Sequence, residues 1–237
     1  MKDYRKGELK SYVIGNILFI ITLSGKLDSI LKSNLPNNID IIRLFFESAL
    51  LSSILYIYIY IIDSIIPSSI KERIVFLITK KPGTVVFEYV VSKKKGYDDD
   101  RFTDEEMKKC YSDIYMEIDT LSKRINKVSD KKQKKQIQKE LSNYQNSKWF
   151  EIYRKHEDEQ AVFETQKDYL LNRDMNAITV SILVLYLVVC VSTNLIPFNM
   201  AVIVFLIIEF IAISIASNSK AIRFVLTVIS RDINKKS

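Results

Sequence analysis

The sequence predicts a mainly α-helical membrane protein with four transmembrane helices in two hairpins and a cytoplasmic, mostly helical insert between the hairpins. Three observations lead to this fold class. The mean hydropathy is +0.04 although 27% of the residues are charged, so the apolar residues must be concentrated in parts of the chain. Residues 175–208 contain no charged side chain. The basic residues gather outside the apolar segments.

The first predicted transmembrane helix covers about residues 11–31. Its apolar core, Tyr12 to Leu23, follows four basic residues among the first ten. A secretory signal peptide begins in the same way, but no small-residue cleavage pattern follows this run. Extending the helix to residue 31 supplies the roughly 20 residues that a hydrocarbon layer of about 30 Å requires. We therefore predict an uncleaved span.

The second predicted transmembrane helix covers about residues 44–66 and completes an N-terminal region, 1–66. Glu47 and Asp63 lie near the two ends of this segment, close enough to reach the interface, and Pro67 follows it.

The third and fourth transmembrane helices are predicted at about 177–196 and 198–217, so that 177–217 forms a tight hairpin. Residues 218–237 then form a basic amphipathic tail suited to the inner membrane surface.

The distribution of Lys and Arg predicts the orientation of the chain. Residues 1–10 carry four, 24–43 carry three, 67–176 carry twenty-three and 217–237 carry five. Because basic residues accumulate on the cytoplasmic side, both termini and the 67–176 insert are predicted to be cytoplasmic.

The first part of the insert has the composition of a short β-hairpin. Residues 73–79 and 84–91 are rich in β-branched and aromatic side chains, and Pro82-Gly83 lies between them. The alternative is that residues 73–79 continue a helix that begins after Pro67.

A capping box at Thr103-Asp104-Glu105-Glu106 predicts the start of a helix with a heptad seam. The seam packs either against an antiparallel partner in the same insert, where Ile137, Leu141 and Tyr144 offer a shorter stripe, or against identical subunits in an oligomer. Its members are Met107, Tyr111, Ile114, Ile118, Leu121, Ile125 and Val128.

The most basic stretch, residues 123–139, could bind an anionic ligand or the acidic inner leaflet, or be a solvated helix face. Interleaved aromatic residues are missing from it, which argues against direct nucleic-acid binding. The Asp98 to Asp100 cluster lacks the further ligand spacing of a calcium site. His156, the only histidine, has no partner at the spacing of a catalytic triad, and we predict no enzyme activity, cofactor or metal.

A helical stretch from Trp149 to Asp174 is predicted to couple the insert to the membrane, through Trp149, Tyr153, Arg154, Arg173 and Asp174.

Glu209 lies in the middle of the fourth span, where a carboxylate costs at least about 2.5 kcal/mol. It is predicted to line a polar path or an interface between subunits. The alternative is neutralisation within one subunit. Because no Lys or Arg occurs at comparable depth to form a salt bridge, this alternative is a protonated acid bonded to Ser or Thr.

Several short patterns resemble those of small bacterial membrane proteins found in antiphage defence systems, among them the transmembrane effector of Hailong-type systems. The resemblance covers about residues 80–195. It rests on Lys81-Pro82-Gly83 with Val86-Phe87, on Trp149-Phe150-x-x-Tyr153-Arg154-Lys155, and on Tyr169-Leu170-Leu171-x-Arg173-Asp174.

The resemblance implies an effector that forms a homo-oligomer in the bacterial inner membrane, stays closed in uninfected cells and disrupts the membrane potential once triggered. The expected partner at the insert is a nucleotide-type ligand or a cytosolic protein. The competing expectation is a non-conducting membrane anchor or sensor.

Overall fold

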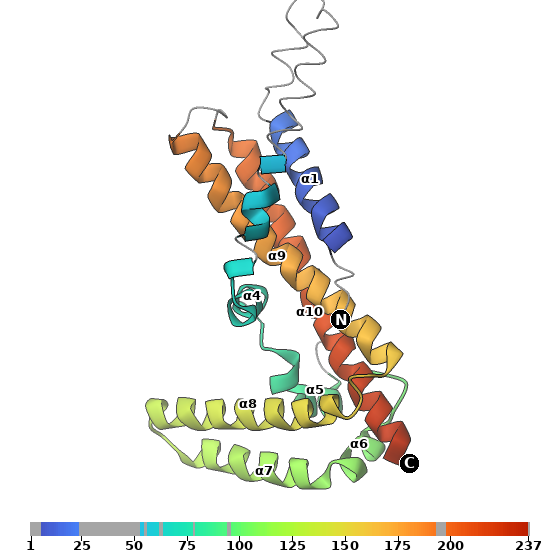
Figure 1. Ribbon diagram of the computed structural model, residues 1–237. Helices are drawn as coiled ribbons and strands as arrows, with labels where there is room; N and C mark the ends of the chain where they lie inside the picture. Colours follow the sequence, from blue (N-terminus) through green and yellow to red (C-terminus); the bar gives the residue numbers. More distant parts are fainter. Residues whose placement is uncertain are drawn as a thin grey trace, which may run out of the picture. The chain divides into compact units, whose positions relative to one another are not determined.

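The computed structural model describes residues 6–23, 53–54, 56–61, 64–77, 79–93, 96–192 and 198–236 (Figure 1). The described residues are mainly helical and include no strand, which confirms the mainly α fold class. The helices are α1 (Lys6–Leu23), α4 (Ser68–Val75), the 3-10 helix η1 (Pro82–Thr84), α5 (Val86–Ser92), α6 (Asp104–Cys110), α7 (Ser112–Lys127), α8 (Lys131–Arg154), α9 (Gln160–Ser192) and α10 (Met200–Lys236).

The chain divides into two compact units. Unit 1 takes its described residues from Met1–Val75 and Leu170–Ala216, and unit 2 takes its described residues from Phe76–Tyr169 and Ser217–Ser237. Helices α9 and α10 each contribute residues to both units. The second predicted span, residues 44–66, and the end of the first lie largely outside the described residues.

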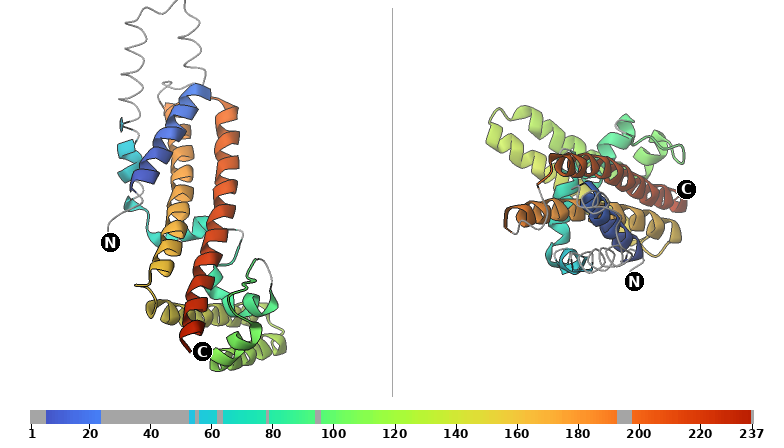
Figure 2. Two further views of the ribbon diagram at one scale, coloured as in Figure 1. Left: turned by 90° about the vertical axis from the view of Figure 1, so that its right-hand side faces the viewer. Right: turned by 90° about the horizontal axis from the view of Figure 1, so that it is seen from above.

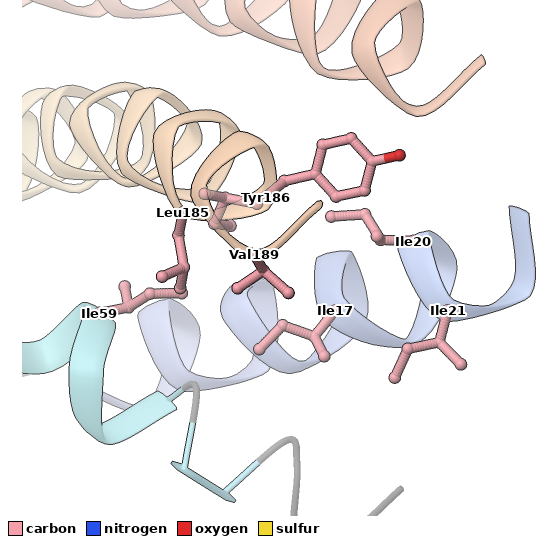
Figure 3. A pocket seen from close by; sticks show the side chains of 8 residues that line it. Ile17, Ile20, Ile21, Ile59, Leu185, Tyr186 and Val189 are labelled. Carbon is pink, nitrogen blue, oxygen red and sulfur yellow. The ribbon is translucent and has the colours of Figure 1, made fainter. Parts of the chain in front are cut away.

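Unit 1 is built on an apolar core shared by α1, α9 and α10. Within this unit α9 and α10 run side by side (Figure 2). A small apolar pocket lies where Ile17, Ile20 and Ile21 of α1 approach Leu185 and Val189 of α9 (Figure 3). The side chains around the pocket are aliphatic apart from Tyr186, so a polar side chain elsewhere in this core needs a hydrogen-bond partner within it.

Unit 2 is a helical unit in which α7 and α8 form an antiparallel pair (Figure 1). The capping box is confirmed, because the Thr103 hydroxyl accepts from the Glu106 amide and the Glu106 carboxylate accepts from the Thr103 amide. The helix that begins there is interrupted at Tyr111, which has φ −128° and ψ 32° and separates α6 from α7.

The predicted β-hairpin is wrong. Residues 73–75 are the end of α4, which begins after Pro67 as the helical alternative expected but stops at Val75, and residues 86–91 belong to α5. In α5, Val86, Phe87 and Val90 are buried on one helical face, and Lys93 ends the helix in the left-handed conformation at φ 48°. Burial of this face outweighs the β-preference of the Val, Phe and Tyr residues of α5.

The tail of the chain packs inside unit 2. Phe224 contacts the aromatic rings of Trp149, Tyr153 and Tyr169, and the apolar side chains around it are buried. The face that was predicted to lie on the membrane surface, which includes Ile222, Val225 and Ile229, is buried. The 218–237 tail forms the continuous end of α10.

Candidate functional site in the apolar helices

Two of the described helices, α9 and α10, are long and apolar enough to cross a membrane by length and composition. On α10, an exposed apolar face repeats at helical spacing and includes Val204, Ile208, Ile211 and Ile215. The opposite side of the helix packs into unit 1 through Val202 and Leu206. Helix α10 therefore packs one apolar face into unit 1 and leaves another apolar face exposed.

Glu209 lies within unit 1 and bonds to the first helix. Asn16 of α1, which is only 6% exposed, donates from Nδ2 to Glu209 Oε1 at 3.0 Å. The same Nδ2 donates to the backbone oxygen of Tyr12 at 3.2 Å. The structure thus gives Glu209 a partner in its own chain, an amide from a helix 193 positions away. The sequence offered no signal for this pairing beyond one Asn in an apolar run.

Tyr12 extends the polar cluster to α9. Its hydroxyl lies 2.6 Å from Thr179 Oγ1, and the Thr179 hydroxyl donates to the backbone oxygen of Met175 at 3.0 Å. Because Thr179 uses its proton on Met175, the Tyr12 hydroxyl is the donor in the Tyr12–Thr179 bond. Polar side chains therefore join α1 to both α9 and α10.

Asn176 makes a second connection between α9 and α10. Its side chain is fully buried and donates to Ser214 Oγ at 2.7 Å and to the backbone oxygen of Phe210 at 3.3 Å. We refer to Tyr12, Asn16, Asn176, Thr179 and Glu209 as the polar cluster. Its members come from three helices, α1, α9 and α10, which also supply the buried apolar cluster of unit 1.

A buried ionic group lies at one end of the α9 part of unit 1. Arg173 donates to Asp174 Oδ1 from Nε at 2.9 Å and from a terminal nitrogen at 2.8 Å. Lys71 of α4 lies 3.8 Å from the same oxygen, and all three side chains are at most 8% exposed. Arg173 and Asp174 were predicted as coupling residues, whereas Lys71 was not singled out by sequence reasoning.

The other predicted coupling residues belong to unit 2. Trp149 and Tyr153 stack with ring centroids 5.7 Å apart, and Arg154 lies over the Phe150 ring at 4.7 Å. The stretch predicted as one helix is two, because α8 ends at Arg154 and α9 begins at Gln160. The structure therefore places the five predicted coupling residues in two separate sets, three in unit 2 and two in unit 1.

A hydrogen-bonded node around Asp232 occupies the turn between α8 and α9. His156 is 2% exposed, with Nε2 3.0 Å from Asp232 and Nδ1 2.7 Å from Glu159. The Tyr111 hydroxyl and the Lys236 ammonium each lie 2.7 Å from Asp232 Oδ2. Sequence reasoning gave His156 no role, since its partners are distant in the chain or have no distinctive spacing.

The electrostatics of this node follow from its contacts. Burial acts to raise the pKa of Asp232, but the bonds from Lys236, His156 and Tyr111 hold it below its ordinary value. Hydrogen bonds from Lys235 and His156 lower the pKa of Glu159. Burial and the bond to Asp232 raise the pKa of Tyr111, so this phenol remains a donor.

The residues of the heptad seam pack against other residues of the same chain. Met107, Tyr111, Ile118 and Leu121 are buried, and the other three members are half-buried. Helix α7 packs against α8, where Ile137 and Leu141 are also buried. This is the packing that the antiparallel alternative described.

The basic stretch at residues 123–139 lies at the end of the α7–α8 pair. Lys123 pairs with Asp119 and Arg124 pairs with Glu140, all of them exposed. An open groove beside this end is lined by Arg124, Lys127, Gln133, Gln136 and neighbouring side chains. The exposed Lys123–Asp119 and Arg124–Glu140 ion pairs contribute little to the stability of the fold.

The chemistry open to the described residues is that of hydrogen bonding and charge. No group of three or more His, Cys, Asp or Glu with metal-binding geometry occurs among them. Cys110 in α6 and Cys190 in α9 are both free and half-buried. Comparison of the chain with family models, with curated proteins and with solved structures gives no match.

Proposed function

We propose that this chain is a membrane-embedded effector of a bacterial antiphage system. It assembles into an oligomeric pore, or depolarises the inner membrane by other means, when its cytoplasmic insert is triggered. The observation that carries the proposal is the polar cluster, in which Glu209 and two buried amides interrupt otherwise apolar helices. Ionisable residues inside membrane helices are costly and mark ion or proton paths.

The proposal includes four transmembrane helices, with both termini and the insert in the cytoplasm. Helices α9 and α10 would form the second hairpin, and α1 would begin the first. The distribution of basic residues supports this orientation. A C-terminal fusion to green fluorescent protein should fluoresce, and a fusion to alkaline phosphatase should be inactive. An active phosphatase fusion would place the C-terminus outside and contradict the topology.

The connection between trigger and membrane is proposed to run along the two long helices. Helix α9 passes from unit 2 to unit 1 between Tyr169 and Leu170, and α10 passes from unit 1 to unit 2 between Ala216 and Ser217. A nucleotide-type ligand or a cytosolic partner bound to unit 2 would therefore have two continuous helical routes to the apolar segments.

The decisive experiment is a depolarisation assay. Expression of the intact chain in bacteria loaded with a potential-sensitive dye should collapse the membrane potential under triggering or high expression. Glu209→Gln should change the rate of collapse while the protein still enters the membrane fraction. Glu8→Gln, the same chemical change at an exposed site on α1, is the matched control and should behave as wild type.

Unchanged depolarisation by Glu209→Gln would remove Glu209 from the mechanism. A normal potential at full expression of the wild-type chain under triggering conditions would exclude the pore, whatever the variant does. Chemical crosslinking of the chain in its membrane should yield discrete oligomers, and a monomer alone would contradict assembly.

The second candidate is a non-conducting anchor or sensor that docks a cytosolic partner. Unit 2 favours it, since this unit has its own aromatic core and a basic hairpin end available for an acidic partner. Normal membrane potential together with co-purification of one cytosolic protein, lost when Lys131 and Lys132 are changed to Glu, would favour the anchor.

A further inference from the structure

The Asn16–Glu209 pair leaves two acceptors without donors. Asn16 Nδ2 donates to Glu209 Oε1, but the other oxygen of each group, Asn16 Oδ1 and Glu209 Oε2, is buried and has no hydrogen-bond partner. Buried acceptors without donors are rare and costly. Here the two belong to groups that are already bonded to each other, so a single cause can account for both.

The orientation of the Asn16 amide is fixed by its contacts. Both of its N–H groups are used, one on Glu209 Oε1 at 3.0 Å and one on the Tyr12 backbone oxygen at 3.2 Å. Exchanging the amide nitrogen and oxygen would set an oxygen against both of these acceptors. The orphan oxygen of Asn16 is therefore a real acceptor.

The neighbouring donors are engaged elsewhere. The Tyr12 hydroxyl also interacts with Glu209, but it has a single proton, and its 2.6 Å bond is to Thr179 Oγ1, whose own hydroxyl donates to Met175. Asn176 donates to Ser214 and to Phe210. Tyr12 is the titratable side chain that faces Glu209 from α1, and on α9 the ionic residues Arg173 and Asp174 bond to each other. Arg173 and Lys71 both lie beside Asp174, and among the described residues Glu209 has no ion pair with a cation.

We propose that Glu209 and Asn16 form a proton-binding site. One proton on Glu209 Oε2 donates to Asn16 Oδ1, while Asn16 Nδ2 donates to Oε1, so that acid and amide bond reciprocally. Binding adds one proton from water to the carboxylate and breaks no covalent bond. The bound proton supplies the missing donor for both orphan acceptors and holds α1 against α10 within unit 1. The inference stands whether or not the chain conducts ions.

The pair offers a set of variants that preserve shape. Gln has the shape of a protonated Glu, and Asp has the shape of Asn. Glu209→Gln places two amides together, which also bond reciprocally without a proton. Asn16→Asp places two acids together. The double variant Asn16→Asp with Glu209→Gln restores an acid and an amide with their positions exchanged, and therefore restores one proton site.

The test is infrared spectroscopy of the full chain in lipid nanodiscs near neutral pH, in H₂O and D₂O. Wild type should show the C=O stretch of a protonated carboxylic acid, shifted in D₂O, and Glu209→Gln should lack it. The double variant should regain such a band, now from Asp at position 16. Selective ¹³C labelling of glutamate should shift the wild-type band and leave the double-variant band in place.

Thermal unfolding in the same nanodiscs gives a second measurement. Glu209→Gln and the double variant should unfold within about 2 °C of wild type, whereas Asn16→Leu should unfold several degrees lower, since it leaves the acid without its partner. The ¹³C-glutamate measurement needs no variant and so remains decisive if a variant fails to fold.

Two results would overturn the proposal. Absence of a glutamic acid C=O band in the wild-type chain would mean that Glu209 is ionised there, with water supplying the donors. A band that appears only when Na⁺ and K⁺ are replaced by choline would mean that the orphan oxygens hold a metal cation instead. Neither result depends on the depolarisation assay, so failure here is distinguishable from failure of the pore proposal.

Discussion

Asp232 is the side chain on which the contacts of unit 2 converge. It is 3% exposed and accepts bonds from His156, Tyr111 and Lys236, which come from three separate parts of the chain. Removing the acceptor from such a group leaves several buried donors unpaired, which costs more than the bonds themselves contribute.

Asp232→Asn should therefore destabilise unit 2 by about 1–3 kcal/mol, because the amide keeps the shape but not the charge of the carboxylate. Urea unfolding followed by Trp149 fluorescence measures this, since Trp149 is the only tryptophan. Asp119→Asn, which loses an exposed pair with Lys123, is the control and should change stability by less than about 1 kcal/mol. Equal effects of the two variants would contradict the central role of Asp232.

The lowered pKa values of Asp232 and Glu159 predict an acid-sensitive unit 2. A carboxyl whose folded pKa lies below its unfolded value of about 4 stabilises the fold fully above that value. The contribution is lost as the pH falls through the folded pKa. Melting temperature should thus be flat near neutral pH and fall below about pH 4, with a shallower fall in Asp232→Asn. Parallel curves for the two proteins would argue against this linkage.

At the scale of elements, η1 fixes the position of the chain against α8. A Cβ at Gly83 would lie 3.1 Å from Trp149 Cε3 and 3.1 Å from Asn146 Oδ1, tighter than ordinary contacts. Pro82 and Gly83 are both buried there. The Pro82-Gly83 pattern in the sequence thus corresponds to a close helix contact in place of the predicted hairpin turn.

Gly83→Ala should disturb this contact and destabilise unit 2 by about 1–3 kcal/mol, because the extra methyl overpacks the site. The Trp149 emission maximum should shift, since its ring is the group displaced. Gly7→Ala, where a Cβ meets nothing within 4 Å, is the control and should leave the emission spectrum unchanged. An unshifted emission spectrum in Gly83→Ala would show that α8 accommodates the extra methyl group without loss of stability.

The Thr103 cap provides a test at the start of α6. Thr103→Ala should lower the free energy of unfolding by about 1 kcal/mol, through loss of the capping box. Thr120→Ala, in the exposed middle of α7, removes a hydroxyl that bonds only to the Met116 carbonyl and should be neutral or slightly stabilising. The denaturant midpoint of Thr103→Ala should therefore lie below the wild-type value, and that of Thr120→Ala should lie at or above it.

Local patterns predicted the elements that depend on neighbours in sequence. The Thr103 cap and the apolar lengths of α9 and α10 are of this kind. The break at Tyr111 depends on tertiary contacts, since this side chain bonds to Asp232, 121 positions away. Likewise α5 is a helix because its buried face packs in unit 2. The contact between Glu209 and Asn16 could not be predicted from the sequence either, because Asn16 stands at no distinctive spacing from other polar residues.

At the scale of the whole molecule, charge and hydropathy separate along the chain. The insert at 67–176 carries 23 of the 35 basic residues, whereas α9 and α10 meet the length and hydropathy required of a membrane span. Alkaline carbonate and high salt should both leave the chain in the bacterial membrane pellet, and detergent should release it. Release by salt alone would show surface attachment through the basic residues and contradict the spans.

The two free cysteines give the molecule a practical property. Cys110 belongs to unit 2 and Cys190 to unit 1, and neither forms a disulfide. The native chain therefore carries one thiol for a spectroscopic label in each unit. Energy transfer between two such labels would report the distance between them. It could follow in real time whether a stimulus received by one unit moves the other.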